Sequence, residues 1–159
     1  MNTDQQHAFT IWVDADACPR DLRDIIELAA IRRKAPTIFV ANSYMHVHPS
    51  EYIAFQLVEK GGDKADDYLA EHAAPDDLAI TADIPLAARL VERGVAVVST
   101  RGEDITNANV GERLAMRNLM EELRGAGMVS SGPREMNKAD VQRFANALDR
   151  FLTRKLGKR

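Results

Sequence analysis

The fold is decided by residues 9–30, which read FTIWVDADACPRDLRDIIELAA. This segment opens with a run of β-branched and aromatic residues without strict alternation, which predicts a strand covered on both faces. Pro19 then suits the first turn of a helix, and apolar residues recur at helical spacing from Leu22 to Ala30. A buried strand followed by an amphipathic helix predicts the start of a βαβ unit, and therefore a parallel sheet covered by helices.

The alternation of strands and helices continues to about residue 98. We expect the further strands at Thr37 to Ala41, Phe55 to Val58, Leu78 to Thr81 and Val95 to Val98. Helices are expected from about Lys64 to Ala73 and from Pro85 to the residues before Gly94. The fold class is therefore α/β, a three-layer sandwich with a mainly parallel central sheet of about five strands.

The sequence pattern changes after residue 98, and we expect no strand beyond that point. A helix is predicted from Gly111 to Arg124. After a loop of Gly, Ser and Pro, a last helix begins at Asn137, which is a good N-cap. The length of 159 residues fits one domain. Residues 111–159 are then a C-terminal helical extension of that domain.

Composition excludes several classes of protein. With 45% hydrophobic and 28% charged residues the chain falls in the globular range. No stretch approaches the roughly 18 consecutive apolar residues of a membrane span. The single Cys excludes a disulfide framework and a cysteine zinc site. No Lys or Arg precedes Arg20, which argues against a secretory signal, so we expect a cytoplasmic protein without membrane contact.

The net charge of −3 is unevenly distributed. Residues 1–100 carry 9 Lys and Arg against 16 Asp and Glu, whereas residues 101–159 carry 12 against 8. This division indicates an acidic site in the first part and a basic surface near the end. The basic surface includes Arg154, Lys155, Lys158 and Arg159. For these end residues alone, a solvated helix end is favoured over a nucleic-acid contact.

Acidic residues follow three of the predicted strands. Asp14 and Asp16 follow the first strand, Asp63 and Asp66 the third, and Asp83 the fourth. Ligands of open parallel sheets bind beyond the C-terminal strand ends, so we expect these side chains to meet at one edge. A hard cation such as Mg²⁺ or Mn²⁺ would relieve their mutual repulsion. We therefore predict a metal site. The alternative is that Asp16 caps the next helix and the other acids are helix charges facing water.

Several strings in the sequence carry a resemblance to a known family. They are DADACP at Asp14–Pro19, GDKADD at Gly62–Asp67, TADIPLA at Thr81–Ala87, and the closing Gly132-Pro133. Over nearly the whole chain they resemble the YaiI/YqxD family of small bacterial proteins. That family is similar in turn to PIN-like (NYN/PIN nuclease) domains, many of which are metal-dependent nucleases with acids at these strand ends. The resemblance implies a PIN-like nuclease that uses Mg²⁺ or Mn²⁺, with RNA as the favoured substrate.

The resemblance also implicates particular residues in catalysis and metal binding. They are Asp14, Asp16, Asp63, Asp66 and Asp83. In a nuclease, Asp14 and Asp83 would anchor one metal, while Asp63 and Asp66 would hold a second metal or orient the attacking water. This mechanism requires no side-chain nucleophile.

Other side chains are secondary candidates. Arg101 or Lys64 could hold a substrate phosphate, although either equally fits a surface charge. Asp67 falls outside the matched pattern. Cys18 is at a predicted helix N-terminus, where the pKa of a thiol can fall. A packed Cys is favoured, because no His partner is evident in the sequence.

Two other functions stay open. Asp-x-Asp after a leading strand also resembles the start of haloacid-dehalogenase-like phosphatases, in which Asp14 would be the covalent nucleophile and Asp16 the general acid. Against this, Ala17 and Cys18 stand where that family places Thr or Val, and the chain is too short for the usual cap domain. The other alternative is a non-catalytic RNA- or ribosome-associated binding module that uses the basic C-terminal part and binds in a salt-dependent manner.

Overall fold

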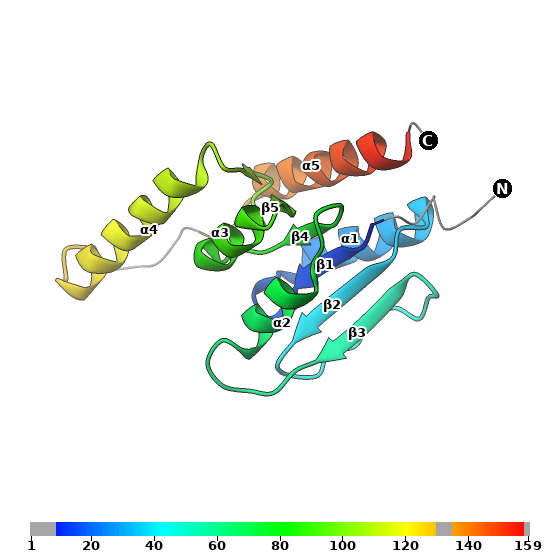
Figure 1. The fold of residues 1–159 in the computed structure, drawn as a ribbon, viewed down its shortest axis with the longest axis horizontal. Coiled ribbons are helices and arrows are strands. Elements are labelled where there is room, and N and C mark those ends of the chain that lie inside the picture. The colour runs from blue at the N-terminus through cyan, green and yellow to red at the C-terminus, as the bar shows by residue number, and fades with distance from the viewer. Residues whose placement is uncertain (1–8, 130–134, 158–159) are drawn as a thin grey trace.

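A six-stranded sheet forms the centre of the computed structural model, which describes residues 9–129 and 135–157. The strands are β1 (Ile11–Asp14), β2 (Thr37–Ala41), β3 (Ile53–Leu57), β4 (Leu78–Ile80), β5 (Ala96–Val98) and β6 (Asp104–Ile105). Their order across the sheet is β3-β2-β1-β4-β5-β6 (Figure 1). The first five strands are parallel and β6 is antiparallel to β5. The predicted α/β class with a mainly parallel sheet is confirmed.

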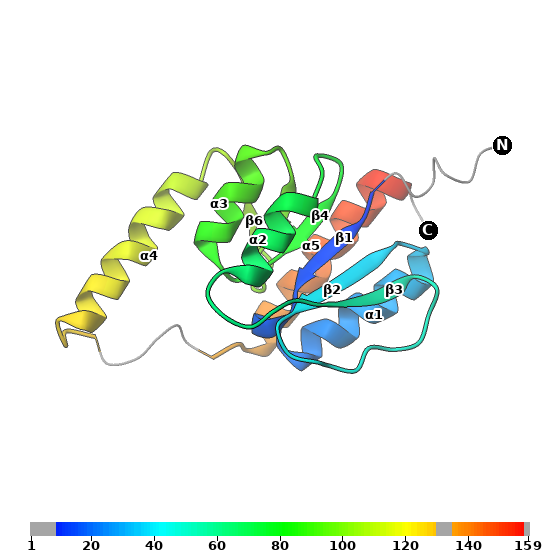
Figure 2. The same ribbon diagram turned by 60° about the horizontal axis from the view of Figure 1, so that its bottom comes forward.

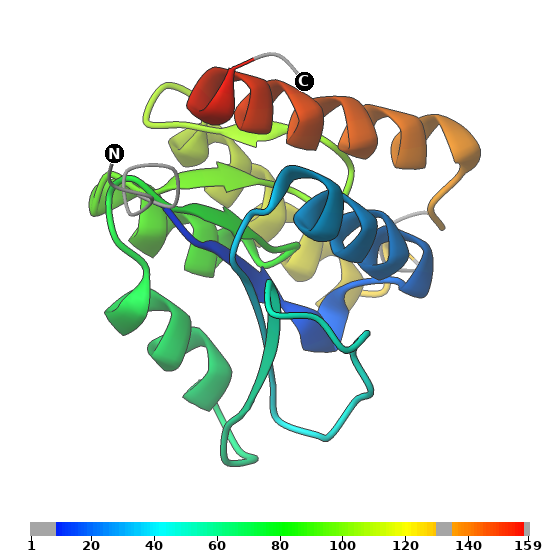
Figure 3. The same cartoon turned by 90° about the vertical axis from the view of Figure 1, so that its right-hand side faces the viewer.

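Helices cover both faces of this sheet. They are α1 (Arg20–Arg33), α2 (Lys64–His72), α3 (Ile84–Glu92), α4 (Val110–Gly125) and α5 (Lys138–Leu156), with a short 3-10 helix η2 (Ala15–Ala17) after β1. Figure 3 shows α1 and α5 side by side on one face and α2 on the other. The three-layer arrangement therefore matches the prediction.

Two apolar cores hold the layers together, because alternate residues of each strand point to opposite faces. Ile11 and Val13 of β1 pack in the core that Leu22 of α1 and Phe144 of α5 complete. Trp12 packs in the other core, with residues of α2 and α3. The β1 strand is thus buried on both sides, as its unbroken apolar run predicts.

The sixth strand was not expected, because two residues are too few to show any periodicity. It follows a turn in which Gly102 donates its N–H to the Ser99 carbonyl. Gly102 has φ of +82°, and a Cβ there would lie 2.4 Å from the backbone of Arg143 in α5. This close approach requires glycine. The prediction that no strand follows residue 98 is wrong.

Helix α5 begins where the sequence predicts. Asn137 caps it in a capping box with Asp140. The carboxylate of Asp140 is fully buried and is paired with Arg101 and Arg143. The Arg101 contact joins the N-terminus of α5 to the turn between β5 and β6.

Helix α4 extends away from the sheet (Figure 2). It packs on α3, and none of its residues is buried. Within residues 9–129 and 135–157, no helix is long and apolar enough to cross a membrane. The Gly132-Pro133 string, and Lys158 and Arg159 of the predicted basic surface, lie outside the described residues.

Candidate functional site

The strand order of the sheet reverses between β1 and β4. From β1 the chain builds β2 and β3 on one side of the sheet, and then returns to build β4 and β5 on the other. The segments that follow β1 and β4 therefore diverge, and ligands bind at such switch points. Asp14 is the last residue of β1, and Asp83 is the N-cap of the helix after β4. Both predicted acids thus lie at the switch point.

Asp14 is held by the neighbouring strand. Its side chain is buried, and its Oδ2 accepts a 2.7 Å hydrogen bond from the hydroxyl of Thr81. Burial raises the pKa of Asp14, the hydrogen bond from Thr81 opposes this rise, and the charges of Asp83 and Asp16 add to it. Asp14 is therefore an oriented carboxylate with acidic neighbours.

Asp83 is fixed by the start of α3. Its Oδ1 accepts the N–H of Leu86 at 3.0 Å, the usual cap interaction. Its own backbone N–H donates to the hydroxyl of Thr81 at 3.0 Å. Thr81 therefore joins Asp14 to Asp83. Sequence reasoning missed this role, although the spacing of two residues between Thr81 and Asp83 is the pattern of a hydroxyl that bonds a nearby backbone amide.

Asp66 on α2 completes the centre of the site. Burial, followed by the charges of Asp83 and Asp14, raises the pKa of Asp66 to about 7. A hydrogen bond between the carboxyl groups of Asp66 and Asp83 contributes to the rise, as does the charge of Asp63. Two neighbouring carboxyl groups are stabilised by a shared proton or by a cation between them. Acids from two different strand ends therefore meet here.

Asp16 and Asp63 lie at the rim, where both are exposed. Asp16 does not cap α1, whose N-cap is Pro19. Its Oδ2 instead accepts the backbone N–H of Asn42 at 2.9 Å, which ties the loop after β1 to the end of β2. The alternative in which Asp16 caps the helix is therefore wrong, because η2 intervenes between the strand and α1.

The secondary candidates for the site either lie apart from the aspartate cluster or already pair with another side chain. Asp67 pairs with Arg89 at 3.0 Å. Arg101 pairs with the buried Asp140 and therefore has a structural partner. Lys64 is exposed at the first turn of α2. Burial raises the pKa of Cys18 to about 12, so this residue is a packed thiol, as expected.

The arrangement suits an open cation site better than a closed one. In the part of the chain that the structure describes, no three His, Cys, Asp or Glu side chains are grouped so as to hold a metal ion. Asp14 and Asp83, which Thr81 and the α3 cap orient, offer two carboxylates. Mg²⁺ is usually held by one or two carboxylates, with water and substrate as the other ligands. The donors present fit that mode of binding.

A groove adjoins the cluster at Asp83. It has a volume of about 600 Å³ and lies between the sheet edge and α4. Asp83 and its neighbours Ala82 and Ile84 form one wall, and Arg113, Met116, Arg117, Met120, Glu121 and Arg124 form the other. Sequence reasoning missed Arg117 and Arg124, although the arginines recur at helical spacing along α4.

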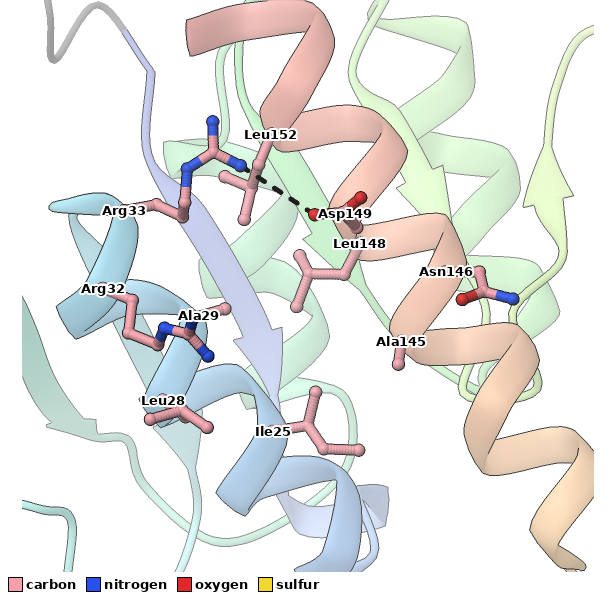
Figure 4. A pocket seen from close by; sticks show the side chains of 10 residues that line it. All are labelled: Ile25, Leu28, Ala29, Arg32, Arg33, Ala145, Asn146, Leu148, Asp149 and Leu152. Atoms are coloured by element: carbon pink, nitrogen blue, oxygen red, sulfur yellow. Dashed lines mark ion pairs between the residues drawn. The ribbon is translucent and has the colours of Figure 1, made fainter. Parts of the chain in front are cut away.

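A second cleft lies on the opposite face of the sheet, between α1 and α5 (Figure 4). Its volume is about 310 Å³, and Ile25, Leu148 and Leu152 are among its lining residues. Arg33 and Asp149 form an ion pair of 3.9 Å in it. None of the clustered aspartates lines this cleft. It is separate from the candidate site.

Comparison with known proteins assigns this chain to a family. The chain matches the family described as "Uncharacterized BCR, YaiI/YqxD family" over residues 12–154. The chain belongs to the YaiI/YqxD family. The matched residues of this YaiI/YqxD chain include all five predicted aspartates. The family resemblance seen in the sequence is confirmed, while its further similarity to PIN-like domains stays a prediction.

Relatives in several bacteria are similar over almost their whole length. A "UPF0178 protein" of Geobacter metallireducens is 52% identical over 144 residues, which cover 91% of this chain and 93% of the relative. A "UPF0178 protein" of Trichlorobacter lovleyi is 50% identical, with coverage of 91% and 94%. One from Shewanella sp. (strain ANA-3) is 46% identical, with coverage of 92% and 97%. No solved structure matches the YaiI/YqxD chain.

Proposed function

We propose that this protein is a divalent-metal-dependent nuclease, with RNA as the favoured substrate and the aspartate cluster as its active centre. One observation carries the proposal: the carboxyl groups of Asp66 and Asp83 lie close enough together to help raise the pKa of Asp66 to about 7. They come from different strand ends, beside the buried Asp14. Paired carboxylates at a switch point are unfavourable for folding alone, because like charges repel. Such pairs are common in catalytic and metal-binding sites, where the shifted pKa values serve the function.

Each aspartate has a distinct part in this mechanism. A bound Mg²⁺ or Mn²⁺ would supply charge neutralisation and an activated water. Asp14 and Asp83 are the fixed carboxylates that would hold the cation, since Thr81 and the α3 cap orient them. Asp66 has a pKa of about 7 and can accept a proton from water at neutral pH. Asp16 and Asp63 stand at the rim and add negative charge.

The phosphatase alternative is less well supported by the geometry. A covalent nucleophile must reach the phosphorus atom in line with the leaving group. Asp14 has only 6% of its surface exposed, and its Oδ2 is engaged by Thr81. The binding-module alternative loses one of its cations, because Arg101 pairs with the buried Asp140.

The test compares neighbouring acids on one helix. Chelator-treated wild type, Asp66→Asn and Asp67→Asn are incubated with fluorescent RNA and DNA oligonucleotides, with and without Mn²⁺ or Mg²⁺. Asp67 is the matched control, because it is an exposed acid of α2 paired with Arg89. We expect metal-dependent cleavage by wild type and Asp67→Asn, and a loss of at least about 100-fold in Asp66→Asn. Equal cleavage by all three preparations would identify a contaminating nuclease and contradict the proposal.

A further inference from the structure

One face of α4 is rich in arginine. Arg113, Arg117 and Arg124 line the groove that begins at Asp83, and they fall on one helical stripe. The whole helix carries three Arg and three Glu, so it is neutral overall. Only Glu121 of these acids lines the groove. The charges are therefore segregated, and the wall that faces the groove is positive.

These arginines are accessible to a ligand. Arg113 pairs with Glu103 and Arg117 with Glu121, and both arginine side chains are more than a third exposed. Exposed ion pairs of this kind contribute about 0 to 1 kcal/mol, so a phosphate can replace the carboxylate. Arg124 has no ion pair with any residue in 9–129 or 135–157. By contrast, Arg101 and Arg143 are both bound to the buried Asp140.

Apart from the charged residues, the groove lining is apolar. Met116 and Met120 lie between the arginines on the same stripe, and Ile84 faces them across the groove. No residue of α4 is buried, and Met116 is 55% exposed. Unbranched methionine side chains adapt to irregular partners. The lining therefore offers apolar contacts for sugars and bases between cationic contacts for phosphates.

We propose that this groove binds a nucleic-acid strand through its phosphates and leads it to the aspartate cluster. The inference rests on the proposed function and names its substrate-binding surface. The charge complementarity is direct, because the acids of the cluster repel phosphate and the adjoining arginines attract it. Arg113 and Arg124 are 11 positions apart, which is about 16 Å along the helix axis. At about 3.4 Å per nucleotide, that length accommodates about five stacked nucleotides.

The test measures binding without cleavage. Fluorescence anisotropy follows fluorescein-labelled 12-mers of uridine and of thymidine in chelator, from 50 to 200 mM salt. The variants are Arg117→Gln with Arg124→Gln, the same pair changed to Lys, and the control Arg32→Gln. Arg32 is an exposed arginine of the α1–α5 cleft (Figure 4). Melting curves check that each variant is folded.

We expect the Gln pair to weaken binding at least about 10-fold at 50 mM salt and to lower the salt slope by about 1.4, which is about 0.7 for each arginine on a single strand. The Lys pair should keep most of the affinity, since Lys also binds phosphate as a point charge. The Arg32 control should match wild type. Equal affinities and slopes for wild type and the Gln pair would overturn the proposal.

Two further measurements separate this inference from the nuclease. If wild type binds through these arginines but cleaves neither 12-mer with Mn²⁺, the groove stands and the nuclease fails. If cleavage occurs and the Gln pair changes neither the Kd nor the KM, the nuclease stands and the groove fails. Sedimentation velocity tests whether a second copy of the chain, and not a nucleic acid, binds the open apolar face of α4. Self-association that Met116→Asp abolishes, without oligonucleotide binding, would assign this face to a second copy of the chain and overturn the inference.

Discussion

The hydroxyl of Thr81 donates a 2.7 Å hydrogen bond to the carboxylate of Asp14, across the junction between β4 and β1. The same oxygen accepts the backbone N–H of Asp83. One buried side chain therefore sets the positions of two acids that are 69 residues apart in the sequence. The orientation of the site depends on this hydroxyl, which has no charge of its own.

Replacing Thr81 with Val should destabilise the protein by about 2 kcal/mol. The change keeps the shape of the side chain but leaves the buried Asp14 carboxylate and the Asp83 amide without this partner. The pKa of Asp14 should rise further, because the hydrogen bond from Thr81 opposes the effect of burial. Urea unfolding measures the loss. Thr81→Ser retains the hydroxyl, and a loss as large as that of Val would show that the hydrogen bond is not the cause.

Replacing Asp14 with Asn should have opposite effects with and without metal. In chelator the variant should melt at or above wild type, since Asn keeps an acceptor for Thr81 and removes a buried charge near Asp83 and Asp16. With Mn²⁺ the order should reverse, because a ligand that binds only the folded state stabilises it and the variant binds less. Melting curves in both conditions decide. The same deficit in both would reject a metal at Asp14.

Because of Asp66, the free energy of unfolding of the metal-free protein should fall as the pH rises from about 4 to about 7. Its pKa is raised from 3.8 to about 7, so the folded state keeps a proton that the unfolded chain releases. The stabilisation from this bound proton is fully present below the pKa of Asp66 in the unfolded chain. It is lost as the pH rises through the pKa of Asp66 in the folded protein. Asp66→Asn should therefore gain stability relative to wild type, on the order of 1 kcal/mol after solvent screening.

Urea unfolding in chelator at pH 5, 6, 7 and 8 measures this difference. The gap between Asp66→Asn and wild type should widen with pH and level off above pH 8. Mn²⁺ affinity should rise over the same range, because the ionised carboxylate of Asp66 adds negative charge beside the cation that Asp14 and Asp83 would hold. A gap that does not change with pH would show that Asp66 titrates normally.

Replacing Gly102 with Ala should destabilise the protein by more than about 2 kcal/mol. The added Cβ would lie within 2.6 Å of the backbone of Arg143 and Phe144, in addition to the strain of positive φ. Gly127 is the matched control, with φ of +74° and open space around the Cβ. Gly127→Ala should cost only about 1 kcal/mol. Thermal unfolding compares the two variants. Equal losses of stability would mean that α5 moves away from the added Cβ at little cost.

Most of the architecture was predictable because buried parallel strands are unbroken apolar runs. β1 and β2 are examples, and the aspartates after β1 and β4 follow from the rule for switch points. The bond from Asn42 to Asp16 was not predictable, because it depends on the register in which β1 lies beside β2. The arginine stripe of α4 can be read from its spacing. Which face of α4 stays open depends on how α3 packs against it, and no sequence pattern states that.

The absence of any buried residue in α4 makes this helix a separate unit of local unfolding. Segments with few buried apolar contacts open at a small fraction of the global free energy. By contrast, α5 buries Phe144, Leu148 and Phe151, so its amides open only with the core. Amide hydrogens of α4 should exchange orders of magnitude faster than those of α5. Helix α4 can therefore fray and re-form while the three-layer body, and with it the geometry of the aspartates, stays intact.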